Sequence, residues 1–310
     1  MSTESYRAYK GRCDFSVGTL FAHDGFALML LEACRTAGLE RPFEYVFGSV
    51  SCALQGGRAA PVSFEEDELR AIVQRYAREG VGCRLTFSNH EIAEEDLGDP
   101  TAALLLGLLN EGESNGVIVS SDLLAEHIRS SYPRLQLISS LVKPTAERVL
   151  GQEGPSYYNE LCERYDIVVL NSAFAWDDAF LSQLEHPDRI ELIVNHRCRP
   201  NCPLSREHYA TQTQAARAAC TGQFLAQRRL EGRLTQINHR CLEMRKANPL
   251  ANSLISCQRI QELVERGFVH FKLEGRDYPL PVMVRDIGTW IFEPEGIYPS
   301  LAQSLLGQPL

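Results

Sequence analysis

The chain has 310 residues, of which 40 are acidic and 31 basic, and its formal net charge is −9. This acidic balance disfavours non-specific binding to nucleic acid, which needs a basic surface. Hydrophobic residues make up 44% of the chain, ample for a large core. The N-terminus shows no apolar signal segment, and no apolar run is long enough to span a bilayer, so we expect a cytoplasmic protein without a membrane span.

Short apolar segments recur along the chain and predict β-strands. Most are rich in Val, Ile and Phe, as is typical of strands that are buried on both faces. Eight of them can be counted: Asp14–Thr19, Glu44–Val50, Cys83–Ser88, Gly116–Ser120, Leu135–Leu141, Asp166–Asn171, Ile190–Asn195 and Phe268–Glu274.

Segments with helical periodicity separate these strands. Gly38 is a plausible C-cap for the first, and Ser63 resembles an N-cap before the second. Alternating strands and helices predict a parallel sheet, and eight strands fit a closed (β/α)8 TIM-type barrel better than an open sheet. The predicted helices are Phe26–Ala37, Leu69–Tyr76, Pro100–Leu109, Asp122–Ser131, Tyr157–Arg164 and Asp178–Leu184.

Polar residues follow several of the predicted strands. In a barrel these strand ends face the active site, so we expect Asn89, Asn171 and Asn195 to bind a polar substrate. His90 could act there as a catalytic acid or base. Ser121, by contrast, precedes a predicted helix and is interpreted as its N-cap.

The regular alternation is interrupted once. About sixty residues, 197–255, separate the last two strands and form an insertion at the C-terminal end of the seventh strand. Residues 277–310 follow the last strand and are predicted to be a C-terminal extension that packs on the barrel. We therefore expect residues 1–310 to form a single barrel domain that carries these two additions.

The insertion begins with two cysteines. Cys198 and Cys202 are separated by three residues, and Pro200 and Pro203 prevent this segment from forming a regular helix. Such a loop can direct two thiolates at one point. Because disulfides are rare in cytosolic proteins, a metal is the first function to consider for these cysteines.

Three more cysteines follow, namely Cys220, Cys241 and Cys257. Thiolate ligands suit zinc or an iron–sulfur cluster. We expect Cys241 and Cys257 to complete the metal site, with Cys220 as the substitute for Cys241. His196 and His208 are further candidate ligands, which would favour zinc.

The last predicted strand ends in charge. Lys272, Glu274 and Arg276 stand two residues apart and therefore share one side of the strand. Two interpretations remain open: a buried ion-pair network that closes the barrel, or a catalytic cluster at its mouth.

The segment Phe271–Arg276, FKLEGR, resembles the FKIEGR signature of the collagenase-like peptidase family, which includes the ubiquinone-biosynthesis proteins UbiU and UbiV. Cys257 and the dipeptide Arg197-Cys198 match cysteine positions of that family. The resemblance is that of a divergent member, because specific motifs occur only between about residues 190 and 276. It implies a barrel that carries a 4Fe–4S cluster.

Function is inferred mainly from this resemblance. It implies a redox-type enzyme or enzyme subunit that modifies a small organic substrate, for example by oxygen-independent hydroxylation. One alternative is a metal-dependent hydrolase or peptidase, with zinc as cofactor. Another is a non-enzymatic iron–sulfur scaffold that pairs with a related chain. Some relatives modify RNA, and the arginines of the insertion would supply a local basic patch.

Overall fold

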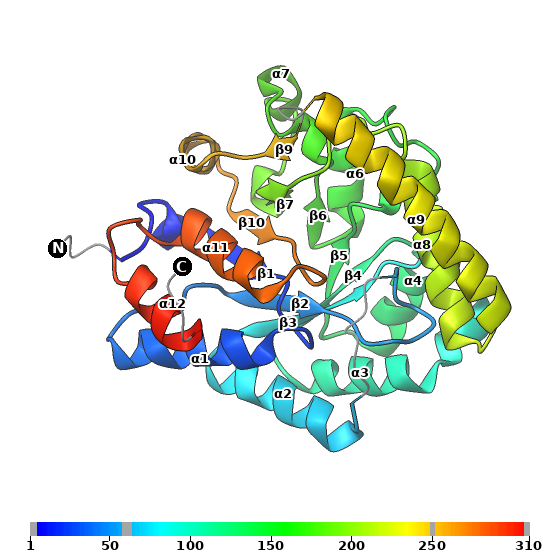
Figure 1. Ribbon diagram of the computed structural model, residues 1–310, viewed down its shortest axis with the longest axis horizontal. Helices are drawn as coiled ribbons and strands as arrows, with labels where there is room; N and C mark the ends of the chain where they lie inside the picture. Colours follow the sequence, from blue (N-terminus) through cyan, green and yellow to red (C-terminus); the bar gives the residue numbers. More distant parts are fainter. Residues whose placement is uncertain (1–4, 58–63, 249–251, 307–310) are drawn as a thin grey trace.

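The computed structural model describes residues 5–57, 64–248 and 252–306. Eight parallel strands form a closed barrel, with helices around its outside (Figure 1). The predicted TIM-type barrel is thus confirmed. The strands pair in the order β1-β10-β7-β6-β5-β4-β3-β2. Their bounds are β1 Asp14–Val17, β2 Tyr45–Gly48, β3 Gly82–Phe87, β4 Gly116–Val119, β5 Gln136–Ser139, β6 Ile167–Val169, β7 Ile190–Ile193 and β10 His270–Leu273.

Alternate residues of each strand point to opposite sides of the barrel wall. One set packs outward against the helices and belongs to the main core, for example Val117 and Leu192. The other set points inward and forms a separate apolar layer within the barrel. This layer comprises Phe47, Ile118, Ile138, Ile167, Val169 and Ile193. Burial on both faces explains why the strands are recognisable as nearly continuous apolar runs.

The helices predicted between the strands are present. Ser121 caps α4 by accepting a hydrogen bond from the Leu124 amide, as predicted. The second helix is capped by Glu65, whereas Ser63 lies outside the described residues. The helices that follow β1 to β6 and precede β10 are α1 Asp24–Thr36, α2 Glu66–Arg78, α3 Pro100–Glu111, α4 Asp122–Ser131, α5 Lys143–Ala146, α6 Pro155–Arg164, α7 Asp178–Leu181 and α10 Cys257–Glu265.

The insertion is a helical hairpin. Helices α8 (Ser205–Cys220) and α9 (Phe224–Ala247) pack against each other along one side of the molecule (Figure 1). Its two ends are held together by a short antiparallel pair, β8 (Asn195–His196) with β9 (Ser253–Leu254). The hairpin therefore leaves and rejoins the barrel at the same place.

The residues after β10 continue the barrel pattern. Helix α11 (Leu280–Ile291) buries Val284, Ile287 and Ile291, so it serves as the outer helix of the last unit. Helix α12 (Tyr298–Leu306) packs next to α1 and α11. The segment predicted as an extension thus includes the helix that completes the barrel. No helix of the described segments is both long and apolar enough to cross a membrane.

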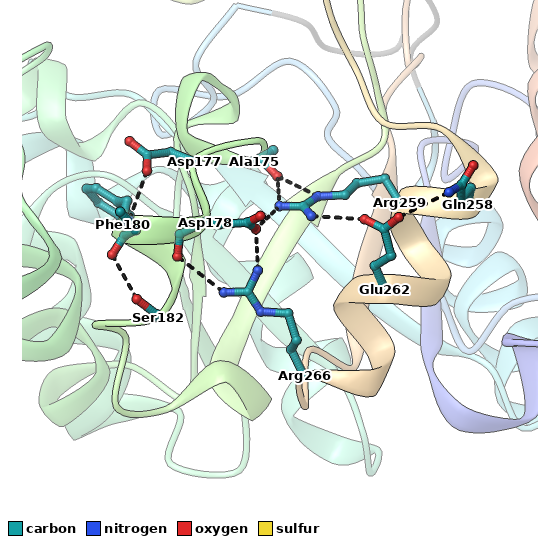
Figure 2. Close-up of polar contacts among 10 residues, drawn as sticks. Ala175, Asp177, Asp178, Phe180, Ser182, Gln258, Arg259, Glu262 and Arg266 are labelled. Atoms are coloured by element: carbon teal, nitrogen blue, oxygen red, sulfur yellow. Dashed lines mark hydrogen bonds and ion pairs between the residues drawn. The ribbon is translucent and has the colours of Figure 1, made fainter.

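A cluster of polar contacts ties α10 to the segment after β6 (Figure 2). The guanidinium of Arg259 donates two hydrogen bonds to the Ala175 carbonyl oxygen, each 3.2 Å long. It also donates to Asp178 (2.7 Å) and to Glu262 (3.0 Å). Arg266 contacts the same carboxylate of Asp178. This cluster positions α10, which leads directly into β10.

Replacement of Arg259 by lysine should loosen this junction. Lysine keeps the charge but cannot present a planar fork to both a carbonyl and a carboxylate. We expect the free energy of unfolding to fall by about 1–3 kcal/mol, since the buried carbonyl of Ala175 loses its donors. Chemical denaturation measures this. Arg70→Lys, at an exposed arginine that pairs with Glu66, is the control and should change stability by less than about 0.5 kcal/mol.

Candidate functional site

An ion-pair network lies inside the barrel. The carboxylate of Glu191 accepts hydrogen bonds from Ser16 (2.9 Å), Arg84 (3.0 Å) and Lys272 (3.1 Å). All four residues are buried and come from different strands, namely β1, β3, β7 and β10. Lys272 thus takes part in a buried ion-pair network.

The network sets the charge of its members. Burial by itself would raise the pKa of Glu191, but attraction to Lys272 and Arg84 outweighs it and lowers this pKa to about 2. Burial also lowers the pKa of Lys272, and the nearby Arg84 adds to this effect while Glu191 opposes it. One carboxylate thus balances two buried cations.

A cavity of about 130 Å³ lies at the carboxyl ends of the strands, under the α8–α9 hairpin. Lys272 lines it, with its ammonium 4.1 Å from the centre of the Phe47 ring. Thr86 also lines it, and its buried hydroxyl has no hydrogen-bond partner among the described residues. We call this space the mouth cavity. Its other walls include Ser88, Ile118, Ser140, Val169, Ile193, Leu204, His208, Gln212, Ile237, Glu274 and Arg276.

Three cysteines face the mouth cavity. Cys198 and Cys202 come from the loop after β8, and Cys241 comes from α9. Burial raises the pKa of the Cys241 thiol, and the neighbouring Cys198 and Cys202 raise it further. The thiols are therefore near enough to repel one another when ionised, and a bound cation would relieve that repulsion.

The loop between Cys198 and Cys202 is shaped by its own sequence. Pro200 and Pro203 restrict the backbone, and Asn201 adopts a left-handed conformation with φ of +50°. Asparagine tolerates this conformation better than most residues. The turn places both cysteines in the lining of the same cavity.

His196 connects this loop to the end of β10. Its Nδ1 lies 3.0 Å from the Glu274 carboxylate. Burial would lower the pKa of His196, but Glu274 and then Cys198 outweigh it and raise this pKa to about 10. The imidazole is therefore cationic at neutral pH, and Glu274 is partly neutralised by it.

Two other cysteines lie elsewhere. The Cys257 thiol donates to the Thr289 carbonyl oxygen (3.3 Å), and Cys257 is absent from the mouth cavity lining. The Cys220 thiol lies 3.3 Å from the Ser51 hydroxyl. The structure therefore groups Cys241, rather than Cys220 or Cys257, with the first pair. Among the described residues, no group of three or more His, Cys, Asp or Glu side chains is arranged to hold a metal ion.

The predicted asparagines and His90 have different surroundings. Asn89 donates to the Ala53 carbonyl and accepts from the Glu91 amide, and Asn195 bonds Glu274 and Asp286. These two side chains hold loops together, and neither lines the cavities described here. The Nδ1 of His90 lies 3.3 Å from the Thr213 hydroxyl of α8, and His90 is absent from the lining of the mouth cavity.

Asn171 lines a second, larger cavity of about 600 Å³. We call this the side cavity. It shares His196, Cys198 and Cys202 with the mouth cavity, so the cysteine loop lies between the two spaces. Asn171 also caps a short 3-10 helix through the Ala173 amide and donates to Glu153.

The sequence interpretation did not include Arg84 and Glu191. The sequence does mark these two residues, because each is the charged residue within an otherwise largely apolar strand. A charge at such a position needs a partner on a neighbouring strand. From α8, His208 was already a candidate ligand, whereas Gln212 had no comparable signal because its place in the cavity lining depends on how the hairpin folds over the barrel.

No family model matches the chain, and no curated protein sequence matches it. Among solved structures it is similar to the U32 peptidase Mk0906, with 14% identity over 57% of this chain and 71% of that one, at a TM-score of 0.42. It is also similar to a GH113 beta-1,4-mannanase, with 14% identity over 67% of this chain and 84% of that one, at a TM-score of 0.32. At these TM-scores neither similarity assigns a family, and the conclusion supported here is an eight-stranded barrel whose own residues must indicate its chemistry.

Proposed function

We propose that this protein is a redox-type enzyme that holds an iron–sulfur cluster on Cys198, Cys202 and Cys241. The observation that carries the proposal is the convergence of these three thiols on the mouth cavity, which also contains Lys272. The enzyme would modify a small organic substrate bound in that cavity.

The donor set consists of three thiolates, which are the usual ligands of iron–sulfur clusters. In a tetrahedral zinc site with Zn–S bonds of about 2.3 Å, the sulfurs must approach one another to roughly 4 Å. The described residues offer no such ready-made group of three. A cluster would instead be held by the thiolates of Cys198, Cys202 and Cys241, the ligand type that iron–sulfur clusters use. His208 lines the same cavity and is a candidate for a fourth position, whereas the cationic His196 pairs with Glu274.

The residues of the mouth cavity would have different roles beside an iron–sulfur cluster. The cluster supplies electrons when bound. Arg276 and the orphaned hydroxyl of Thr86 offer donors to polar atoms of a substrate, and the inward apolar layer contacts its carbon atoms. Lys272 holds a proton next to the substrate, with Glu191 fixing the position of its ammonium group. The hairpin covers the cavity and limits the entry of water.

Anaerobic purification and reconstitution with iron and sulfide test the proposal. We expect a brown protein with broad absorption near 400 nm and about four irons per chain, since a 4Fe–4S cluster contains four. A colourless protein that holds one zinc would contradict the proposal and favour the hydrolase alternative. A protein that takes up neither metal would also contradict it.

A further inference from the structure

We propose that the side cavity binds the phosphate group of an organic phosphate monoester. The proposal depends on the lining of that cavity and goes beyond the metal centre. Although the chain as a whole is acidic, none of the described residues that line this cavity is Asp or Glu. Arg199 and Arg206 both line it. Its electrostatic character is therefore opposite to that of the molecule, which is the expected property of an anion site.

The beginning of α8 adds donors. Ser205 and Arg206 are the first two residues of this 16-residue helix, and both line the side cavity. The first amides of a helix have no acceptor within the helix, and the helix dipole favours an anion there. One of these amides, that of Ser205, donates to the Cys202 carbonyl (3.1 Å).

Buried polar atoms without partners provide an independent observation. The Ser172 hydroxyl is buried, with the residue only 5% exposed, and it has no hydrogen-bond partner among the described residues. Ser172 lines the side cavity and comes from the segment after β6. The Nε of Arg199, which also lines the cavity, is buried and equally without a partner. Such groups are costly unless something binds them, and an oxyanion satisfies both.

The one acidic residue in the first turn of α8 does not interfere. Glu207 faces a different groove, where it accepts hydrogen bonds from Arg233 (3.2 Å) and Arg240 (3.1 Å). Its charge is thereby compensated by these two arginines, and Glu207 is absent from the lining of the side cavity. Asp and Glu are thus absent from the described lining of the side cavity, whose two cysteines, Cys198 and Cys202, are those of the proposed metal centre.

The volume of the side cavity and its other lining residues indicate the kind of molecule to which the phosphate is attached. A volume of about 600 Å³ is within the usual range for a small-molecule site and far exceeds a bare phosphate. Leu141, Leu150 and Tyr209 supply an apolar wall. The multiple donors match the three terminal oxygens of a monoester better than the two of a carboxylate. A phosphate attached to an apolar or aromatic group fits both the hydrogen-bond donors and the apolar wall of the side cavity.

Phenyl phosphate is a suitable probe, and titration calorimetry on the purified full chain measures its binding. We expect measurable affinity for phenyl phosphate, weaker binding of inorganic phosphate and little binding of benzoate. Arg206→Ala should weaken phenyl phosphate binding about tenfold or more, as expected for one lost charge-assisted hydrogen bond. Arg229→Ala, at an exposed arginine in the Glu207 groove, is the matched control and should leave the affinity unchanged.

Ser172→Ala separates binding from folding. Because its hydroxyl has no partner in the protein, the variant should be as stable to heat as the parent or slightly more so. Its affinity for phenyl phosphate should nevertheless fall about three- to tenfold. The proposal would be overturned if benzoate bound as tightly as phenyl phosphate. It would also be overturned if Arg229→Ala lost as much affinity for phenyl phosphate as Arg206→Ala, or if neither Arg206→Ala nor Ser172→Ala lost affinity. Iron content, measured in the same samples, reports on the metal centre separately.

Discussion

Replacement of Glu191 by glutamine is expected to lower the free energy of unfolding by about 3–5 kcal/mol. Glu191 is 1% exposed and bonds both Lys272 and Arg84 inside the barrel. Glutamine has almost the same volume but no charge, so two buried cations would lose their counterion. Urea denaturation of the parent and the variant, analysed at the same pH, measures the difference.

The matched control is Glu66→Gln. Glu66 accepts a hydrogen bond from Arg70 at 3.2 Å, but both side chains are exposed. Exposed pairs contribute little, so this variant should differ from the parent by less than about 0.5 kcal/mol. If Glu191→Gln proved as stable as Glu66→Gln, the buried network could not be the electrostatic centre of the barrel.

The Glu191 carboxylate should also make the stability of the folded protein depend on pH in the acidic range. The pKa of Glu191 is lowered from its usual 4.5 to about 2 in the folded protein. A lowered pKa stabilises the folded state fully above 4.5, and this contribution is lost as the pH falls from 4.5 towards 2. As the pH is lowered across this range, the unfolding temperature of the parent should therefore fall more steeply than that of Glu191→Gln. Parallel curves for the two proteins would contradict the assignment.

Serine substitutions should divide the cysteines into two groups. Cys198→Ser, Cys202→Ser and Cys241→Ser are each expected to lose most of the bound iron, because all three thiols face the mouth cavity. Cys257→Ser is expected to retain it, because that thiol donates instead to Thr289. Iron analysis and the visible spectrum after identical reconstitution report the result.

These variants also test the resemblance on which Cys257 was predicted as a ligand. Loss of iron in Cys257→Ser with retention in Cys241→Ser would favour the predicted family position over the grouping seen in the structure. Cys220→Ser is a further control, since its thiol lies beside Ser51. Thermal stability, measured on each variant, distinguishes loss of a ligand from loss of the fold.

Local sequence patterns predicted most of the fold. The eight strands are short apolar runs that are buried on both faces, so their composition alone marks them. Ser121 caps α4 through a hydrogen bond three residues along, and Gly38 adopts a φ of +72° directly after the C-cap of α1. The cysteine loop also followed from its own residues, since two prolines restrict a span of only a few residues.

The tertiary structure decided which distant residues meet. Cys241 joins Cys198 only because α9 folds back over the barrel, whereas Cys257 starts a helix that faces Thr289. Likewise, the pairing of Glu191 with Lys272 depends on β7 and β10 being neighbours in the closed barrel. Sequence periodicity reports whether a residue is buried, because burial repeats with the local backbone geometry. It does not identify which distant residue a buried residue contacts, because that contact is set by how the elements pack.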